Sequence, residues 1–345
     1  MPSVSIPIKS PEEIFKDVLE RSFSDRGIAF SRLENFKKLT GGASHDTWAF
    51  DLISDKSNGS DRPLVFRRTY GDAVLGMPLE EEFFLMKRLY EQGYPVPYQL
   101  FIERDRGGAE FGSFSVCERV SGTDLRKALS SGSYNVTRKK IGERLVSLLA
   151  ELHKLDSRFL SVDNESFSRL SVIDNEVKRW TVNAFDPVGL ENYPVISAAS
   201  DWLNNNIPDV PELTIVHGDF KANNILYSNS GEVFVLDWEL AHIGDPLEDL
   251  AWSMLWNSDD DLVGGIYTPQ DLVAEYERRS GAGIDRRRLF YWQLYSLVKL
   301  SVILLTGSGT LTSSVKPSVT HTLLARAVPS IERSIVSFMM RTLDC

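Results

Sequence analysis

Two short stretches of the sequence decide the fold. They read HGDFKANN over residues 217–224 and VLDWE over residues 235–239. The apolar residues 213–216 lead the chain into the first stretch, a polar turn with one carboxylate, one cation and two carboxamides. A hairpin around residues 229–231 then brings a second carboxylate, Asp237, to the end of an apolar strand. Two Asp and an Asn brought together in this way supply the oxygen ligands that Mg²⁺ prefers.

The spacing of these polar residues is specific. Asn224 follows Asp219 by 5 positions, and Asp237 follows Asn224 by 13. Both intervals match a kinase catalytic loop and its metal-binding Asp. With its His-Gly-Asp form, the pattern resembles the aminoglycoside phosphotransferase and choline kinase superfamily, most closely the bacterial and acyl-CoA-dehydrogenase-associated phosphotransferases. The resemblance covers about residues 30 to 310.

This resemblance implies a role for each polar residue. Asp219 would position the acceptor hydroxyl and take its proton, and Lys221 would meet the transferred phosphoryl group. Asn224 and Asp237 would hold Mg²⁺ on the phosphates of ATP. Asp249 resembles the family Asp that braces the catalytic loop from the next helix.

The same resemblance implies a nucleotide clamp earlier in the chain. Gly41, Gly42 and Ser44 lie in a turn between two predicted strands, where glycines let backbone N–H groups approach phosphates. A later strand resembles the hinge between kinase lobes, where the backbone of Glu118 and Val120 would bond adenine.

A cation and a helix Glu would complete the clamp. Arg67 occupies the position of the strand-three Lys of kinases, with Arg68 as the alternative if the register is off by one. Arg keeps the charge but is bulkier and forked, so the phosphate geometry would differ. Glu82 would orient this cation, and on spacing alone Glu80 or Glu81 could do so.

Local signals place the first elements. Ser10 and Glu13 form a capping box for a first helix that is expected to end near Ser22. Strands are then expected over residues 36–39, 47–53, 64–68, 99–104 and 114–120.

The order of elements indicates a small β-rich lobe and a larger helical lobe, and the resemblance implies an α+β, two-lobed protein-kinase-like fold. Residues 30–120 read as a mainly antiparallel sheet with one inserted helix over residues 79–92, and helices dominate from about residue 124. We expect a small nucleotide-clamping lobe over residues 1–117. The hinge and a larger helical lobe, with the catalytic loop, metal loop and acceptor site, would occupy residues 118–345.

Composition excludes several classes of protein. The 345 residues include 38 Lys and Arg against 48 Asp and Glu, a net charge of −10, which argues against general affinity for nucleic acid or anionic lipid. Cys117 and Cys345 form neither a disulfide framework nor a metal-ligand spacing. The N-terminus carries no secretory signal, and the apolar residues 292–305 are too few to span a bilayer. We therefore expect a cytoplasmic protein without nucleic-acid or membrane partners, and the sequence leaves its oligomeric state open.

These features predict an ATP- and Mg²⁺-dependent phosphotransferase that acts on a hydroxyl of a small molecule. Gly218 stands where protein kinases carry Arg, and only residues 240–244 separate Trp238-Glu239 from a Gly-Asp-Pro turn, which leaves little room for a docked peptide. The subgroup resemblance favours a hydroxyacyl-type acceptor, with an aminoglycoside-like compound as the other candidate. A non-catalytic nucleotide-binding module and, less favoured, a protein kinase are the alternatives.

Overall fold

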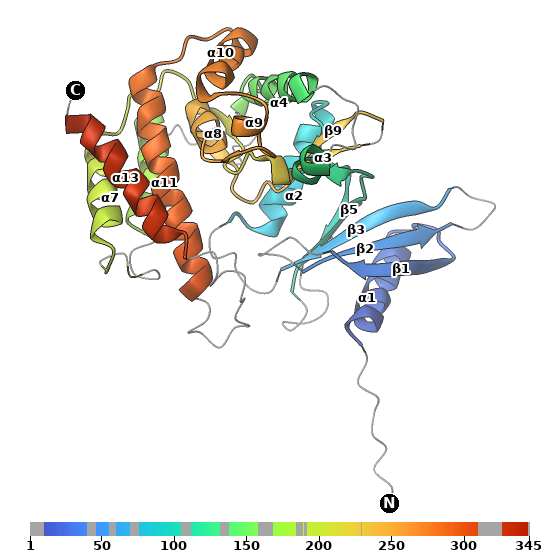
Figure 1. Ribbon diagram of the computed structural model, residues 1–345. Helices are drawn as coiled ribbons and strands as arrows, with labels where there is room; N and C mark the ends of the chain where they lie inside the picture. The colour runs from blue at the N-terminus through green and yellow to red at the C-terminus, as the bar shows by residue number, and fades with distance from the viewer. Residues whose placement is uncertain are drawn as a thin grey trace, which may run out of the picture. The chain divides into compact units, whose positions relative to one another are not determined.

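The computed structural model describes residues 10–39, 46–54, 60–69, 76–104, 112–131, 138–157, 168–183, 189, 192–228, 230–309 and 326–343 (Figure 1). The chain forms two compact units. The sheet unit comprises Met1–Thr123 and Leu226–Glu239, and the helical unit comprises Asp124–Ile225 and Leu240–Cys345. An antiparallel sheet in one unit and mainly helices in the other confirm the expected α+β class.

The first helix of the sheet unit is fixed by its predicted capping box. The Ser10 side chain accepts the N–H of Glu13 at 3.2 Å, and Glu13 Oε2 accepts the N–H of Ser10 at 2.7 Å. Helix α1 (Pro11–Asp25) therefore starts where predicted and runs one turn further than Ser22. Its extra turn is stabilised because Phe23 is fully buried in the core of this unit.

The sheet has the strand order β1-β2-β3-β5-β4, and every neighbouring pair is antiparallel. Helix α2 lies between β3 and β4 in sequence, as predicted. Phe50 and Phe66 from the sheet pack with α1 in one apolar core. The bounds are β1 Arg32–Lys38, β2 Asp46–Ile53, β3 Arg62–Arg68, α2 Leu79–Glu91, β4 Gln99–Glu103 and β5 Phe114–Glu118.

Strand β1 begins four residues before its predicted start. Its register against β2 shifts between Glu34 and Lys37, and Asn35 has a φ of 57°. Such a bulge breaks the alternation of buried and exposed side chains. The first half of the strand therefore has no clean period-two signal in the sequence.

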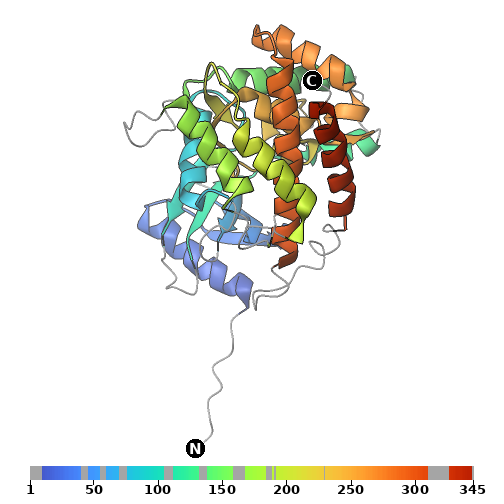
Figure 2. The same ribbon diagram turned by 90° about the vertical axis from the view of Figure 1, so that its left-hand side faces the viewer.

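The helical unit is built around α11 (Arg286–Gly309), which packs against α5, α7, α8 and α13. Figures 1 and 2 both show α13 beside α11. The other helices are α3 Leu125–Ser131, α4 Arg138–Leu152, α5 Arg169–Thr181, α7 Pro194–Asn205, η3 Ala222–Asn224, α8 Pro246–Ser253, α9 Leu262–Gly265, α10 Pro269–Ser280 and α13 Val328–Leu343. The short strands are β6 Thr123–Asp124, β7 Thr214–Val216, β8 Ile225–Tyr227, β9 Val233–Val235, β10 His242–Gly244 and β11 Asn257–Ser258.

The apolar part of helix α11 is longer than the residues 292–305 expected from the sequence. Its segment Arg286–Thr306 is long and apolar enough to cross a membrane by length and composition, and 67% of the relevant window is buried inside the structure. A core helix of a globular protein meets the same criterion. The side chains of Trp292, Tyr295 and Val298 are fully buried against neighbouring helices, which accounts for its composition.

The division into units differs from the expected one at Leu226–Glu239, which belongs with the sheet unit. The N–H of Val235 donates to the carbonyl of Pro95 at 2.8 Å, and the N–H of Met77 donates to Glu239 at 2.7 Å. These bonds join residues more than a hundred positions apart, so no local pattern could reveal them. The first boundary falls after Thr123 rather than after residue 117.

Replacement of Leu19 by Ala should destabilise the sheet unit. Leu19 is fully buried in α1, so Leu19→Ala should lower the free energy of unfolding by about 2–5 kcal/mol. Ile14, on the same helix, is 40% exposed, and Ile14→Ala should cost less than about 0.5 kcal/mol. Urea denaturation followed by circular dichroism compares the two. Equal losses would contradict the packing of α1 described here.

Candidate active site

The polar loop, residues 217–224, begins where a buried strand ends. β7 pairs antiparallel with β10, which fixes the start of the loop in the helical unit. Gly218 has a φ of 78°, and a Cβ on it would lie 2.3 Å from the carbonyl oxygen of Leu240. Only glycine combines this left-handed backbone with so close an approach. The loop therefore has a steric reason for glycine at the position where protein kinases carry Arg.

The carboxylate of Asp249, on α8, holds the backbone of the polar loop. Its Oδ2 accepts the N–H of His217 at 2.7 Å, and its Oδ1 accepts the N–H of Gly218 at 2.8 Å. Burial raises the pKa of Asp249, but the hydrogen bond and charge of His153, together with His217, outweigh burial and hold the pKa below its ordinary value. The carboxylate is thus ionised and fully engaged with the loop.

Two further side chains support Asp249 from other helices. The Nε2 of His153 lies 3.2 Å from Asp249 Oδ2, and its Nδ1 lies 2.6 Å from the hydroxyl of Tyr276. Burial raises the pKa of Tyr276. Because a carboxylate can only accept, the Nε2 of His153 carries the proton that it shares with Asp249. Neither partner carries a sequence signal, since only the packing of α4, α8 and α10 joins them.

Donors surround the carboxylate of Asp219, which is 8% exposed. Trp252 Nε1 donates to Oδ1 at 2.9 Å, and Asn224 Nδ2 donates to Oδ2 at 2.7 Å. The Nζ of Lys221 lies 2.8 Å from the same Oδ2. Charge-assisted hydrogen bonds compensate the loss of water and fix the orientation of the anion. A carboxylate so oriented can accept the proton of a hydroxyl that binds beside it.

Trp252 is a site residue that no motif in the sequence indicated. It lies 33 positions from Asp219, and its ring packs edge-on against Trp256 at a centroid distance of 5.9 Å. Lys221 Nζ lies 5.2 Å from the Trp256 ring, within the range of a cation–π contact. The Trp256 ring and the Asp219 carboxylate together fix the position of the Lys221 ammonium.

The Asn224 side chain is oriented by the loop itself. Its Nδ2 donates both to the Asp219 carboxylate and, at 2.9 Å, to the Asp219 carbonyl. Because the amino group is directed at Asp219, the carboxamide oxygen of Asn224 is the atom that could bind a cation.

In the sheet unit, an ion pair joins the predicted cation to the predicted helix Glu. Arg67 donates to Glu82 Oε1 at 2.7 Å, and Glu82 is almost fully buried. The three alternatives lie elsewhere: Arg68 donates to Asp46 at 3.3 Å, Glu80 binds Arg104, and the Glu81 side chain is exposed.

The charge on Arg67 is strongly stabilised. Burial opposes the charged guanidinium, but the attraction and hydrogen bond of Glu82, with a further contribution from Asp237, raise the pKa of Arg67. A cation held in this way stays charged and available to an anionic ligand.

Asp237 lies near the Arg67–Glu82 ion pair and has an unusual backbone conformation. Its φ is 67°, a left-handed value that a non-glycine residue seldom adopts. The N–H of the next residue, Trp238, donates to Glu82 Oε1 at 3.3 Å. Backbone strain of this kind persists where the surrounding contacts hold it and often marks a functional position.

The strand expected to form the hinge is β5. The N–H of Glu118 donates to the carbonyl of Tyr98 at 2.9 Å. The following Arg119 N–H donates to Pro63 at 3.0 Å, just before Val120. Within β5, Cys117 is buried, and burial raises the pKa of its thiol to about 12, so this thiol is unreactive.

The predicted phosphate-binding turn, with Gly41, Gly42 and Ser44, lies outside the described residues. The two expected metal ligands fall in different units, Asn224 in the helical unit and Asp237 in the sheet unit. Each offers a hard oxygen donor, which fits Mg²⁺.

A sequence model of a group described as the phosphotransferase enzyme family matches residues 35–290. Acyl-CoA dehydrogenase family member 11 from Rattus norvegicus is 31% identical over 242 residues, which are 65% of this chain and 30% of the relative. The Homo sapiens protein of the same name is 32% identical over 219 residues, 59% of this chain and 27% of the relative. The chain thus spans less than a third of the length of these relatives.

Solved structures share the fold. A Ralstonia eutropha JMP134 protein assigned as an aminoglycoside phosphotransferase aligns with a TM-score of 0.70 at 19% identity, over 94% of this chain and 98% of its own. Spectinomycin phosphotransferase in complex with ADP and spectinomycin aligns with a TM-score of 0.60 at 13% identity, over 96% and 99%. The kinase-like phosphotransferase fold expected from the sequence is therefore confirmed.

Asp249→Asn should destabilise the helical unit. The substitution replaces one accepting oxygen by an amino group that faces a backbone N–H, so the free energy of unfolding should fall by about 2–4 kcal/mol. Urea denaturation followed by near-ultraviolet circular dichroism measures this loss. The control Asp174→Asn removes a partly exposed i,i+4 pair with Lys178 and should cost no more than about 0.5 kcal/mol. A loss as small for Asp249→Asn would contradict its bracing role.

Proposed function

Because this chain belongs to the phosphotransferase enzyme family, we propose that it moves the γ-phosphoryl group of ATP, in the presence of Mg²⁺, to a hydroxyl of a small molecule. The family and the structural neighbours support a small-molecule phosphotransferase. The observation that carries the proposal is the buried, oriented carboxylate of Asp219 with Asn224 and Lys221 as partners. We also propose a cytoplasmic location, in keeping with the composition.

In the proposed reaction, Asp219 binds the acceptor hydroxyl and takes its proton as the oxygen attacks phosphorus. Trp252 and Asn224 donate to the two oxygens of Asp219 and so fix the orientation of its carboxylate. An acceptor hydroxyl bound to this carboxylate would therefore be oriented for the attack. Lys221, beside the carboxylate, stabilises negative charge on the transferred group.

The nucleotide side of the reaction is assigned to the sheet unit. Arg67, oriented by Glu82, binds phosphate oxygens, and the carbonyl of Glu118 with the N–H of Val120 binds adenine. The N–H of Glu118 donates to the carbonyl of Tyr98, so we assign the carbonyl of Glu118, rather than its N–H, to the nucleotide. Gly41, Gly42 and Ser44 are proposed to approach the phosphates on their sequence pattern alone.

Asp237 and Asn224 would hold Mg²⁺, which neutralises charge on the phosphates when bound. Their oxygen donors fit this hard cation. The strained backbone of Asp237 supports a position that is retained for binding rather than for stability.

For the acceptor we propose a hydroxyacyl-type metabolite ahead of an aminoglycoside-like compound. The relatives named as acyl-CoA dehydrogenase family members are 31–32% identical, whereas the named antibiotic phosphotransferases share the fold at lower identity. Two acidic side chains near the polar loop are already paired: Asp260 binds Arg126, and Asp261 caps α9. Paired in this way, these two carboxylates offer little uncompensated negative charge to a polycation.

A non-catalytic nucleotide-binding module is the main alternative, and it would bind ATP without turnover. A protein kinase is less favoured, because the described segment from Trp238 passes directly through β10 into α8. That short path contains no long segment for docking a peptide. Transfer of labelled phosphate to protein substrates would revive this alternative.

Purified protein should release ADP from Mg-ATP faster with at least one hydroxylated compound, tested in a panel of hydroxyacyl derivatives and aminoglycosides. Asp219→Ala should lower kcat with that acceptor by about 10²–10⁴-fold, because the proton acceptor is lost, and should leave ATP binding intact. The control Asp201→Ala changes an exposed carboxylate on α7 and should keep full activity. Undiminished turnover by Asp219→Ala would refute the assignment.

Asp237→Asn should weaken the binding of Mg-ATP itself. Asn tolerates the left-handed backbone found at this position, so the change removes a charge without new strain. We expect the Kd of Mg-ATP, measured by isothermal titration calorimetry, to rise about tenfold or more, while ATP binding without Mg²⁺ changes little. Glu91→Ala, at the exposed end of α2, is the control. An unaltered Mg²⁺ dependence would count against Asp237 as a ligand.

A further inference from the structure

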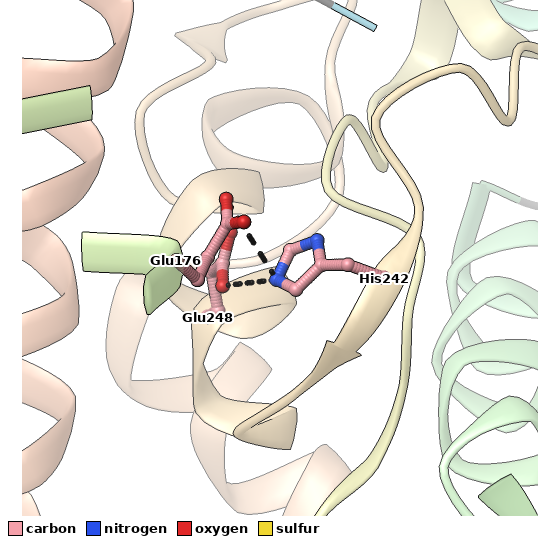
Figure 3. Close-up of side chains that lie close together, drawn as sticks. All are labelled: Glu176, His242 and Glu248. Carbon is pink, nitrogen blue, oxygen red and sulfur yellow. Dashed lines mark hydrogen bonds and ion pairs between the residues drawn. The ribbon is translucent and has the colours of Figure 1, made fainter. Parts of the chain in front are cut away.

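Behind the polar loop lies a buried cluster of charges that the proposed reaction does not use. Figure 3 shows Glu176 from α5, His242 from β10 and Glu248 from α8 converging on one point. The Nε2 of His242 lies 2.9 Å from Glu248 Oε2 and 4.0 Å from Glu176 Oε1. The Nζ of Lys299, from α11, lies 3.0 Å from the other oxygen of Glu248. The cluster therefore joins four elements of the helical unit.

The contacts of His242 require a protonated ring. Its Nδ1 lies 2.9 Å from the carbonyl of Leu240, which can only accept, and its Nε2 faces the carboxylate of Glu248. Lys299 keeps that carboxylate ionised. Burial alone would lower the pKa of His242, but Glu176 and Glu248 outweigh it and raise the pKa to about 9. In turn, although burial opposes the charge on Glu248, His242 and Lys299 lower its pKa to about 2.

The geometry does not suit a metal ion, although the three ligand atoms lie within 4.8 Å of one another. The Nε2 of His242 carries a proton in this arrangement and has no lone pair for a metal. Glu176 Oε1 already accepts from Trp180 at 2.8 Å and from Tyr295 at 3.0 Å. A cation would have to displace donors that satisfy the cluster.

Both cations of the cluster bind backbone carbonyls at the polar loop. Lys299 is fully buried, and its Nζ donates to the carbonyl of Gly218 at 3.0 Å. His242 donates to the carbonyl of Leu240, which is the oxygen that a Cβ on Gly218 would touch at 2.3 Å. The cluster therefore holds the two chain segments at the point where they cross, next to Asp219.

Lys299 also lies near the aromatic ring that contacts Asp219. Its Nζ is 5.0 Å from the centre of the Trp252 ring, and the indole N–H of Trp252 donates to Asp219. A change at Lys299 or at its partners thus reaches Asp219 by two routes, the Gly218 carbonyl and the Trp252 indole.

We propose that His242, Glu248 and Lys299 are positioning residues that hold the crossing of Gly218 and Leu240, and through it the Asp219 carboxylate, while His242 is protonated. The expected effect of these residues on turnover rests on the proposed function. Their expected effect on the position of the polar loop does not. The charged groups that face His242 are Glu176 from α5, Glu248 from α8 and, through Glu248, Lys299 from α11. Loss of the ring proton leaves one donor for two acceptors, so either the Leu240 carbonyl or Glu248 Oε2 loses its hydrogen bond from the ring.

The first test needs no activity. In protein labelled with ¹³C-histidine and ¹⁵N-tryptophan, NMR follows the His242 ring and the Trp252 indole N–H from pH 6 to 10.5. The variants His242→Gln and Trp252→Phe assign the two signals. We expect His242 to titrate near pH 9, and the Trp252 signal to shift with the same midpoint. In His242→Gln that Trp252 transition should vanish, and in Lys178→Gln, a surface control, it should persist.

The same NMR titration of Glu248→Gln tests whether the two signals report one proton. Removal of this carboxylate should move the midpoints of His242 and Trp252 together to lower pH, since both report one proton. The proposal is overturned if the His242 ring titrates near pH 6.5. It is also overturned if the chemical shift of the Trp252 indole N–H does not change while His242 titrates. Stoichiometric Zn²⁺ or Mn²⁺ bound in wild type and lost in His242→Gln, measured by elemental analysis, would overturn it in favour of a metal site.

The second test measures ADP release with the acceptor found in the screen, or with water if none is found. His242→Gln at pH 7.5 should lower kcat about 10- to 100-fold with the KM for ATP unchanged. Wild type should lose kcat above pH 9, and Glu248→Gln should lose it at lower pH. A rise in KM alone, or an unchanged kcat, contradicts the proposal. If wild type turns over nothing, the proposed function fails, and the NMR titration still decides whether the cluster positions the loop.

Discussion

The carboxylate of Asp249 accepts two consecutive backbone N–H groups, those of His217 and Gly218, and the geometry of the site depends on this contact. A turn with a left-handed glycine has few hydrogen bonds of its own, so a buried anion must satisfy its donors. A buried carboxylate is itself costly unless it is fully hydrogen-bonded. His153 supplies a further donor to Asp249, and Tyr276 in turn binds the other ring nitrogen of His153, which explains why three helices converge behind so short a loop.

Opposite charges bind the two backbone groups of Gly218. Its N–H donates to Asp249, an anion, and its carbonyl accepts from Lys299, a cation. The two groups belong to consecutive peptide bonds, so the two charges together fix the backbone on both sides of Gly218. Lys299 is fully buried and would be unfavourable without Glu248, and Glu248 in turn holds His242. The net charge of −10 gives no hint of this balanced interior.

In the sheet unit, too, a buried carboxylate orients a cation and a backbone segment, with fewer residues. Glu82 Oε1 accepts from Arg67 and from the N–H of Trp238. One buried carboxylate therefore orients the cation and the segment that carries Asp237. In both units, a buried carboxylate fixes the neighbouring backbone and side chains. Asp219 and Arg67, the groups proposed to bind ligands, are oriented by hydrogen bonds from neighbouring residues rather than by their own rotamer preferences.

The sequence by itself determined the fold class, the polar residues of the loop and the pairing candidates, because capping boxes, periodicity and the intervals between Asp219, Asn224 and Asp237 are local properties of the chain. Local spacing could not choose between Arg67 and Arg68, nor among three consecutive Glu residues, since it fixes no side-chain direction. Only the tertiary structure decided that Arg67 pairs with Glu82, that Trp252 binds Asp219, and that Lys299 and His242 stand behind the loop. These partners come from separate helices and strands, and the burial of their charges is defined only when those elements pack.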